Sequence, residues 1–235
     1  MWAILPFRQL FPQHMRHALG SADICFSSPV LSQYFVHGNV HPIHRSHKSP
    51  YGGLFQPAFS RLPTLLDQGK WIHIFPEARV HQHPAHQMRY FKWGISRLLL
   101  ETEIPPAVVP MWIEGFEQIM HESRGFPRFL PRVGKKVVMI FGDELDPKMW
   151  DVYRKRWREL RQKYGDDSEE LRTGEEATKL RVELTTVVRG EVEKLRRARG
   201  WPEEDEGAGT AEFYEKPGMK DWDGRLADGT YVKDT

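Results

Sequence analysis

The sequence lacks several features that would assign a protein to a class at once. Cys25 is its single cysteine, which excludes an intramolecular disulfide framework. Cys25 lies in the apolar run Ile24–Phe26, which favours its being a small buried hydrophobic residue. No run of about 18 apolar residues occurs, so no transmembrane helix is expected and any membrane contact should be at the surface. The formal net charge is only +2, which argues against nucleic acid as a partner.

What is present divides the 235 residues into three segments. Residues 1–145 alternate short apolar runs with amphipathic ones and predict one folded core. Residues 146–199 are highly charged with apolar residues at helical intervals, which predicts a helical extension. Residues 200–235 are rich in Gly, Glu and Asp, and we expect an acidic tail that is disordered or loosely attached.

Periodicity predicts the elements of the first two segments. Strands alternate with helices, which favours an α/β fold with a mainly parallel central sheet flanked by helices, followed by carboxy-terminal amphipathic helices. The first 19 residues fit either a helix packed on the sheet or a segment in the lipid headgroup layer. The predicted strands are 40–45, 71–75, 107–113 and 136–141, and the predicted helices are 55–66, 90–102, 151–163 and 169–199.

The most informative stretch is Ile72–Val80, in which a strand ends at Pro76 and delivers Glu77 and Arg79 into the following loop. Ligands of open α/β sheets bind just beyond the carboxyl ends of strands. A carboxylate beside a guanidinium can position a hydroxyl and a phosphate, respectively. The alternative is a surface turn with an exposed ion pair.

At this point the motifs become recognisable as a set. Phe75–Arg79 resembles the Phe-Pro-Glu-Gly block of the glycerophosphate acyltransferase superfamily, and the runs Gly69–Val80 and Arg89–Leu98 resemble the tafazzin family specifically. Val109–Trp112 followed by Gly115-Phe116 resembles the family's fourth block, and Asp23–Phe26 with the Arg45 region resembles the stretch between its first two blocks. The resemblance covers about residues 1–145, and four segments in the family's order make it specific.

The resemblance implies a phospholipid–lysophospholipid transacylase that works without coenzyme A or a metal and remodels cardiolipin as a peripheral protein of mitochondrial membranes. It implies a His-x-x-x-x-Asp pair, in which the histidine is the general base on a lysolipid hydroxyl. By position it assigns Arg45, Glu77, Ala78 and Arg79 to substrate and phosphate binding. Its partners would be phospholipids, lysophospholipids and the membrane surface, and it leaves the oligomeric state open.

Two departures from the family pattern stand out. No histidine of this sequence is followed five positions later by aspartate, so the sequence offers no catalytic residue. We expect that the chain starts at an internal methionine just after the catalytic block, and a catalytically inert paralogue is the alternative. Ala78 stands where the family usually has glycine, which would cost roughly 1–2 kcal/mol if a left-handed backbone is needed there.

Other interpretations remain beside the acyltransferase. The histidines recur in two groups that are typical of zinc ligands in spacing, but no cysteine or carboxylate completes a tetrahedral site and we expect no metal. Arg154–Arg158 would suit nucleic acid or an anionic lipid, but a solvated helix face balanced by Asp151 and Glu159 is the favoured explanation. A non-catalytic membrane-associated lipid-binding protein and a basic-helix binding module are therefore the alternatives. The two groups are His41, His44 and His47, and His81, His83 and His86.

Overall fold

The computed structural model describes residues 11, 13–45, 52–78, 82–121 and 130–215. The chain forms two compact units that interleave along the sequence. The first unit takes residues up to 76, residues 93–106 and residues 147–182, and the second takes residues 77–92, 107–146 and those from 183 onward. Because this division does not follow chain order, the predicted segment boundaries at 145 and 199 stay predictions.

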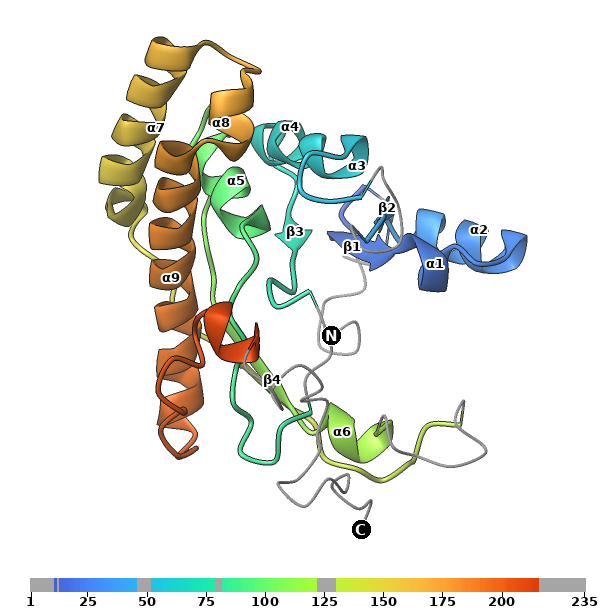
Figure 1. Ribbon diagram of the computed structural model, residues 1–235. Coiled ribbons are helices and arrows are strands. Elements are labelled where there is room, and N and C mark those ends of the chain that lie inside the picture. The colour runs from blue at the N-terminus through green and yellow to red at the C-terminus, as the bar shows by residue number, and fades with distance from the viewer. Residues whose placement is uncertain (1–10, 12, 46–51, 79–81, 122–129, 216–235) are drawn as a thin grey trace. The chain divides into compact units, whose positions relative to one another are not determined.

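The first unit contains a three-stranded parallel sheet, which confirms the predicted α/β class (Figure 1). Its central strand β1 (His17–Ser21) pairs with β2 (Val40–Ile43) on one side and with β3 (Ile72–His73) on the other. Strands β2 and β3 lie within predicted strands, whereas β1 falls where we expected a helix or an interfacial segment. A five-residue strand that contains Gly20 and Ser21 has no clear period-2 pattern, so its pairing depends on its neighbours.

Short helices accompany this sheet in the first unit. The core of buried residues joins Phe59, Leu62, Leu65 and Leu98, and partly buried side chains of all three strands pack against it. Ser28 caps the second helix by accepting a hydrogen bond from the Leu31 N–H, and Pro29 occupies the first helical position. These helices are α1 (Ala22–Cys25), α2 (Pro29–His37), α3 (Pro57–Ser60), α4 (Leu62–Asp67) and α5 (Gly94–Leu100).

The charged helical extension forms as predicted at α7 (Asp151–Tyr164), preceded by a 3-10 turn at Pro147–Trp150. The helix predicted over 169–199 is interrupted, because Gly174 adopts an extended conformation between α8 (Glu169–Thr173) and α9 (Glu175–Ala198). A Cβ at Gly174 would lie 2.4 Å from the Glu170 carbonyl oxygen, so only glycine fits this junction. Residues of α9 belong to both units.

The second unit contains β4 (Met111–Glu114) and β5 (Val138–Phe141), which pair antiparallel instead of extending the parallel sheet. Gly115 follows β4 with φ +97°, and a Cβ there would lie 2.2 Å from the Lys136 carbonyl oxygen. This close approach explains why glycine stands before α6 (Phe116–Ile119).

The segment after α9 differs from the loose tail that we expected, as far as residue 215. Ala208, Phe213 and Tyr214 are buried together and contact Tyr90, and a 3-10 turn spans Glu212–Glu215. A few aromatic residues thus provide the apolar contacts that the acidic composition of this segment obscured. Residues 216–235 lie outside the described residues.

Candidate functional site

Glu77 lies in the turn just beyond β3, as the sequence predicted. Its Oε2 accepts a hydrogen bond of 3.0 Å from the backbone N–H of Arg89. Although part of the residue stays accessible, burial of the carboxyl group raises the pKa of Glu77 to about 7, and the positive charges of Arg89 and Arg189 oppose that rise. A carboxyl group that changes charge near neutral pH beyond the end of a parallel strand is typical of a functional site.

Ala78 adopts the left-handed conformation, with φ +55°. The family's glycine at this position is therefore explained by backbone geometry, because alanine in this region costs roughly 1–2 kcal/mol relative to a right-handed conformation. Ala78 is exposed, and its methyl group faces no packing requirement that would account for the exchange. The predicted neighbour Arg79 lies outside the described residues.

Arg45 follows β2 and lies at the carboxyl end of the parallel sheet. Its Nε donates to the Ser21 hydroxyl at 2.7 Å and lies 3.5 Å from the Asp23 carboxylate. Ser21 ends β1, so the two neighbouring strands bring a guanidinium and a hydroxyl together at the edge where such sheets bind ligands. Asp23 leaves about a third of its side chain exposed. Sequence reasoning used the run from Asp23 as a likeness only and did not assign Ser21 a role.

The structure does not show the four predicted residues together in one site. Arg45 belongs to the first unit, whereas Glu77 and Ala78 belong to the second. Their combination with Arg79 in one phosphate site therefore stays a prediction.

A buried network holds the backbone that presents Arg89 to Glu77. Arg189 of α9 donates to the carbonyl oxygens of Arg89 at 2.9 Å and Met88 at 2.8 Å. Its guanidinium also pairs with Glu204 at 2.5 Å, and Glu204 in turn accepts from the Met88 N–H at 2.7 Å. Both paired side chains are less than a tenth exposed.

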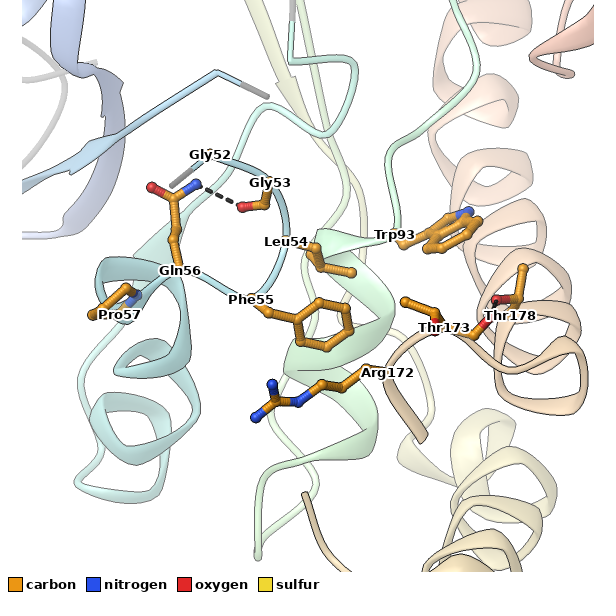
Figure 2. Close-up of a pocket in the computed structure, with 10 residues that line it drawn as sticks. All are labelled: Gly52, Gly53, Leu54, Phe55, Gln56, Pro57, Trp93, Arg172, Thr173 and Thr178. Carbon is orange, nitrogen blue, oxygen red and sulfur yellow. Dashed lines mark hydrogen bonds between the residues drawn. The ribbon is translucent and has the colours of Figure 1, made fainter. Parts of the chain in front are cut away.

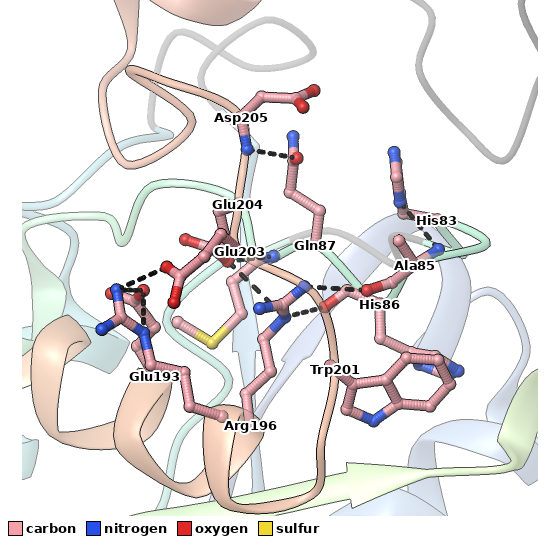
Figure 3. A network of polar contacts seen from close by, with 12 residues as sticks. His83, Ala85, His86, Gln87, Glu193, Arg196, Trp201, Glu203, Glu204 and Asp205 are labelled. Carbon is pink, nitrogen blue, oxygen red and sulfur yellow. Dashed lines mark hydrogen bonds and ion pairs between the residues drawn. The ribbon is translucent and has the colours of Figure 1, made fainter.

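Arg196 extends the same network by one further stretch of the loop. It donates to the carbonyl oxygens of Ala85 at 2.9 Å and His86 at 2.8 Å, and the Gln87 side chain accepts from the Asp205 N–H at 3.1 Å (Figure 3). The backbone from 85 to 89 is thus fixed by side chains that are 100 or more positions away along the chain. Sequence reasoning missed Arg189 and Arg196 because only the apolar residues of this helical segment were considered for packing, and it missed Glu204 because an acidic, loosely attached tail was expected from Gly200 onward.

The histidines of the two predicted groups have separate surroundings. His41 stacks on His17 with ring centroids 5.3 Å apart, and His86 contacts Trp201 at 4.1 Å. Among the described residues no group of three His, Cys, Asp or Glu side chains is placed to hold a metal ion, while His47 and His81 lie outside them. In the part of the chain that the structure describes, no helix combines the length and apolar character needed to cross a bilayer.

Comparison with known proteins gives one family match and several relatives. Residues 1–114 match the family model described as Acyltransferase. The chain is 33% identical to a protein named Tafazzin from Saccharomyces cerevisiae over 247 residues, which covers 87% of this chain and 65% of that protein. It is 35% identical over 150 residues to "Taffazin" of Dictyostelium discoideum, covering 62% of this chain and 49% of the relative.

A third relative carries a different name. The chain is 32% identical over 149 residues to an N-acylphosphatidylethanolamine synthase of Arabidopsis thaliana, which covers 62% of this chain and 50% of that protein. The chain therefore spans between about half and two thirds of the length of these three relatives.

Proposed function

The chain belongs to the tafazzin family of acyltransferases, and from this premise we propose that the protein moves acyl chains between phospholipids and lysophospholipids without coenzyme A. We extend the proposal to cardiolipin as the remodelled lipid and to a peripheral position on mitochondrial membranes. The family model described as Acyltransferase and the name of the Arabidopsis relative, an N-acylphosphatidylethanolamine synthase, support the acyl-transfer part of the proposal.

The observation that carries the proposal is the turn Glu77-Ala78. The carboxyl group of Glu77, with a pKa of about 7, can accept or donate a hydrogen bond to a glycerol hydroxyl near neutral pH. Ala78 has a left-handed backbone, and left-handed residues occur in the turns whose successive N–H groups bind anions. We assign Glu77 to the hydroxyl of the lipid, and Ala78 with Arg79 to its phosphate.

Arg45 has a matching role at the end of β2 in this proposal. Its guanidinium is about a third exposed while Ser21 and Asp23 fix its orientation, so it can meet a phosphate without losing those partners. A bidentate contact between guanidinium and phosphate is the strongest that this residue type makes.

The reaction itself is a simple exchange of ester partners. The lysolipid hydroxyl oxygen attacks the ester carbonyl carbon of the donor, the donor's ester C–O bond breaks, and the proton of the hydroxyl ends on the departing lysophospholipid oxygen. A general base is needed for the attack. No His-x-x-x-x-Asp pair occurs in this sequence, so we assign the base to none of its residues.

The test is transfer of a labelled acyl chain from phosphatidylcholine to monolysocardiolipin. It should be run on the chain as given and on the chain extended by any in-frame coding sequence that precedes Met1. We expect transfer by an extended chain that carries His-x-x-x-x-Asp, with a marked loss on Glu77→Ala. Transfer by the chain as given would contradict the assignment of the base.

The absence of His-x-x-x-x-Asp supports one second candidate, a lipid-binding protein of the same fold without catalysis. It predicts binding of monolysocardiolipin by both chains and transfer by neither. The same assay therefore separates the two candidates.

A further inference from the structure

A pocket of about 570 Å³ lies wholly within the first unit (Figure 2). It is formed where the loop before α3 meets the end of α8 and the start of α9. Its apolar wall is made by Leu54, Phe55 and Trp93, and Arg172 and Thr173 line it from α8. Its volume is in the range of about 300–1,000 Å³ that small-molecule sites occupy.

The loop that forms this pocket is firmly held. Gln56 is buried, and its side chain amide donates to the carbonyl oxygens of Gly53 at 2.6 Å and His44 at 3.1 Å. Its carbonyl oxygen accepts from the His44 N–H at 2.8 Å. One wall of the pocket is therefore tied directly to the residue that precedes Arg45, which the proposed function assigns to the lipid phosphate.

Three positively charged arginine side chains lie near the Phe55 ring. The guanidinium carbons of Arg97, Arg181 and Arg172 lie 4.8, 5.4 and 6.0 Å from its centroid. Arg97 is neutralised by a close ion pair with Glu101. Among the described residues neither of the other two arginines forms an ion pair.

Arg181 is the unusual member of this group because it is almost completely buried, with 1% of its surface exposed. It donates to the carbonyl oxygens of Leu171 at 2.6 Å and Arg172 at 3.0 Å, while its Nε has no hydrogen-bond partner. Burial lowers the pKa of Arg181 to about 10. The carboxylate of Glu101, the partner of Arg97, opposes the charge of Arg181 without forming an ion pair with it, so the three arginines beside the ring share this one carboxylate.

One carboxylate contacts the pocket lining. Glu169 accepts a hydrogen bond of 2.9 Å from the Thr173 hydroxyl and so offsets part of this charge. With Arg172 and Arg181 against Glu169, the pocket keeps an excess of positive charge above an apolar wall. Figure 2 shows the Arg172 side chain beside the Phe55 ring, at the exposed side of the group.

We propose that this pocket binds a single-chain anionic amphiphile. Its phosphate or carboxylate lies against Arg172, and its first methylene groups pack on Phe55, Leu54 and Trp93. A lysophospholipid and a free fatty acid share this chemistry, so the site would hold the lysolipid acceptor or a fatty acid taken up from the surroundings. The inference deepens the proposed function and rests on it for the identity of these ligands.

The test measures binding by calorimetry to the full chain with decyl phosphate and decanoate, both below their micelle concentrations. Arg172→Gln should weaken binding of these probes about tenfold, as the loss of one charge-assisted hydrogen bond does. Arg158→Gln is the matched control, because it removes the same charge from an exposed position of α7, and it should change affinity less than about twofold. Glu169→Gln should strengthen binding about two- to threefold, because it removes the opposing charge.

The relative affinities of decyl phosphate and decanoate identify the source of the anion, and either ligand supports the proposal. Equal binding of neutral decyl maltoside, or equal binding of inorganic phosphate alone, overturns it. So does an equal loss of affinity in Arg172→Gln and Arg158→Gln. Acyl transfer by an extended chain whose Arg172→Gln variant binds decyl phosphate normally would remove this inference and leave the proposed function intact. Binding of decyl phosphate or decanoate by an extended chain that transfers no acyl group would support this inference and remove the proposed function.

Discussion

Ala78 stands at a position whose backbone conformation favours glycine. Its φ of +55° lies in the region that glycine enters freely, and alanine costs roughly 1–2 kcal/mol there. Glycine at the same position lowers the free energy of unfolding by about 0.4–1 kcal/mol, because it makes the unfolded chain more flexible. We therefore expect Ala78→Gly to raise the free energy of unfolding by about 0.5–1 kcal/mol, measured by urea denaturation.

Ala58→Gly is the control for this prediction, because Ala58 lies in helix α3. There the same change should lower the free energy of unfolding by about 1 kcal/mol. If both variants are destabilised alike, the left-handed conformation at position 78 is wrong.

Glu77 makes a second prediction at this scale, on pH. Its carboxyl group titrates near 4.5 when unfolded and near 7 when folded, so between these values the folded state keeps a proton that the unfolded state has lost. Stability should therefore fall as pH rises from about 4.5 to 7, and the full cost, at most roughly 3 kcal/mol, applies above pH 7. Glu77→Gln keeps an acceptor for the Arg89 N–H and should remove this cost.

The measurement is the difference in unfolding free energy between Glu77→Gln and the parent chain at pH 4 and pH 8. We expect no difference at pH 4 and a more stable variant at pH 8. Comparing the two proteins cancels the histidines that titrate in both. Glu159→Gln, an exposed change on α7, should show no such pH dependence, and a similar curve for it would refute the assignment to Glu77.

The position of these residues could be predicted from sequence because a strand ending in proline and a motif of known order determine it locally. The left-handed backbone at Ala78 was foreseen only as a condition, from the glycine of the family. The pKa of Glu77 could not be foreseen, since it depends on burial by residues distant in the chain.

At the scale of elements, helix α7 and the strands that contain a continuous apolar run were predictable, whereas β1 and the break between α8 and α9 were not. Helix α7 lies within one residue of its predicted range because its Trp157 and its charged residues follow the helical period. Strand β1 has five residues and is defined mainly by pairing with β2 and β3, which a local pattern does not encode. The break at Gly174 likewise follows from a close contact with the preceding turn.

The network around Glu204 makes the prediction that belongs to this scale. Glu204→Gln removes the nearer of two carboxylates from the buried guanidinium of Arg189, which keeps Glu193 at 3.6 Å, so the cost should be about 3 kcal/mol, the lower end of what breaking a buried pair costs. We expect a loss of about this size in unfolding free energy, together with faster amide hydrogen exchange at Met88 and Arg89. The exchange rates distinguish release of this loop from general destabilisation.

Its neighbour Glu203 provides the control, because it pairs with Arg197 while 76% exposed. Glu203→Gln should cost at most about 0.5 kcal/mol and leave the exchange rates of the loop unchanged. Equal effects of the two variants would contradict a specific role of Glu204 in holding the backbone next to Glu77.

At the scale of the whole molecule, the order of the motifs predicted the family, whereas the amino-acid composition did not predict how the chain divides into units. The family match over residues 1–114 agrees with the resemblance found from four separated segments. Composition alone suggested a single core and a loose acidic tail, whereas the chain forms two interleaved units and residues 201–215 are packed in one of them. Contacts between distant parts of a chain decide such divisions, and one sequence does not display them.

The proposed membrane association is the last property that belongs to the whole molecule. The formal net charge of +2 produces only a weak overall field, so apolar contacts should dominate binding to a lipid surface. Helix α2 exposes Val30 and Tyr34, four positions apart on one face and 78% and 72% exposed. We propose that this face enters the headgroup layer, because its apolar side chains are left exposed.

Val30→Glu should then lower the partition of the chain onto phosphatidylcholine vesicles by roughly tenfold. The change removes an apolar side chain that the lipid layer would bury, and it adds a charge that resists desolvation. Val152→Glu introduces the same residue at an exposed position of α7, where Val152 is 58% exposed, and should change partition less than about twofold. Co-sedimentation at constant salt measures both. A similar loss in the two variants would mean that added negative charge alone weakens binding, and α2 would then have no special part in meeting the membrane.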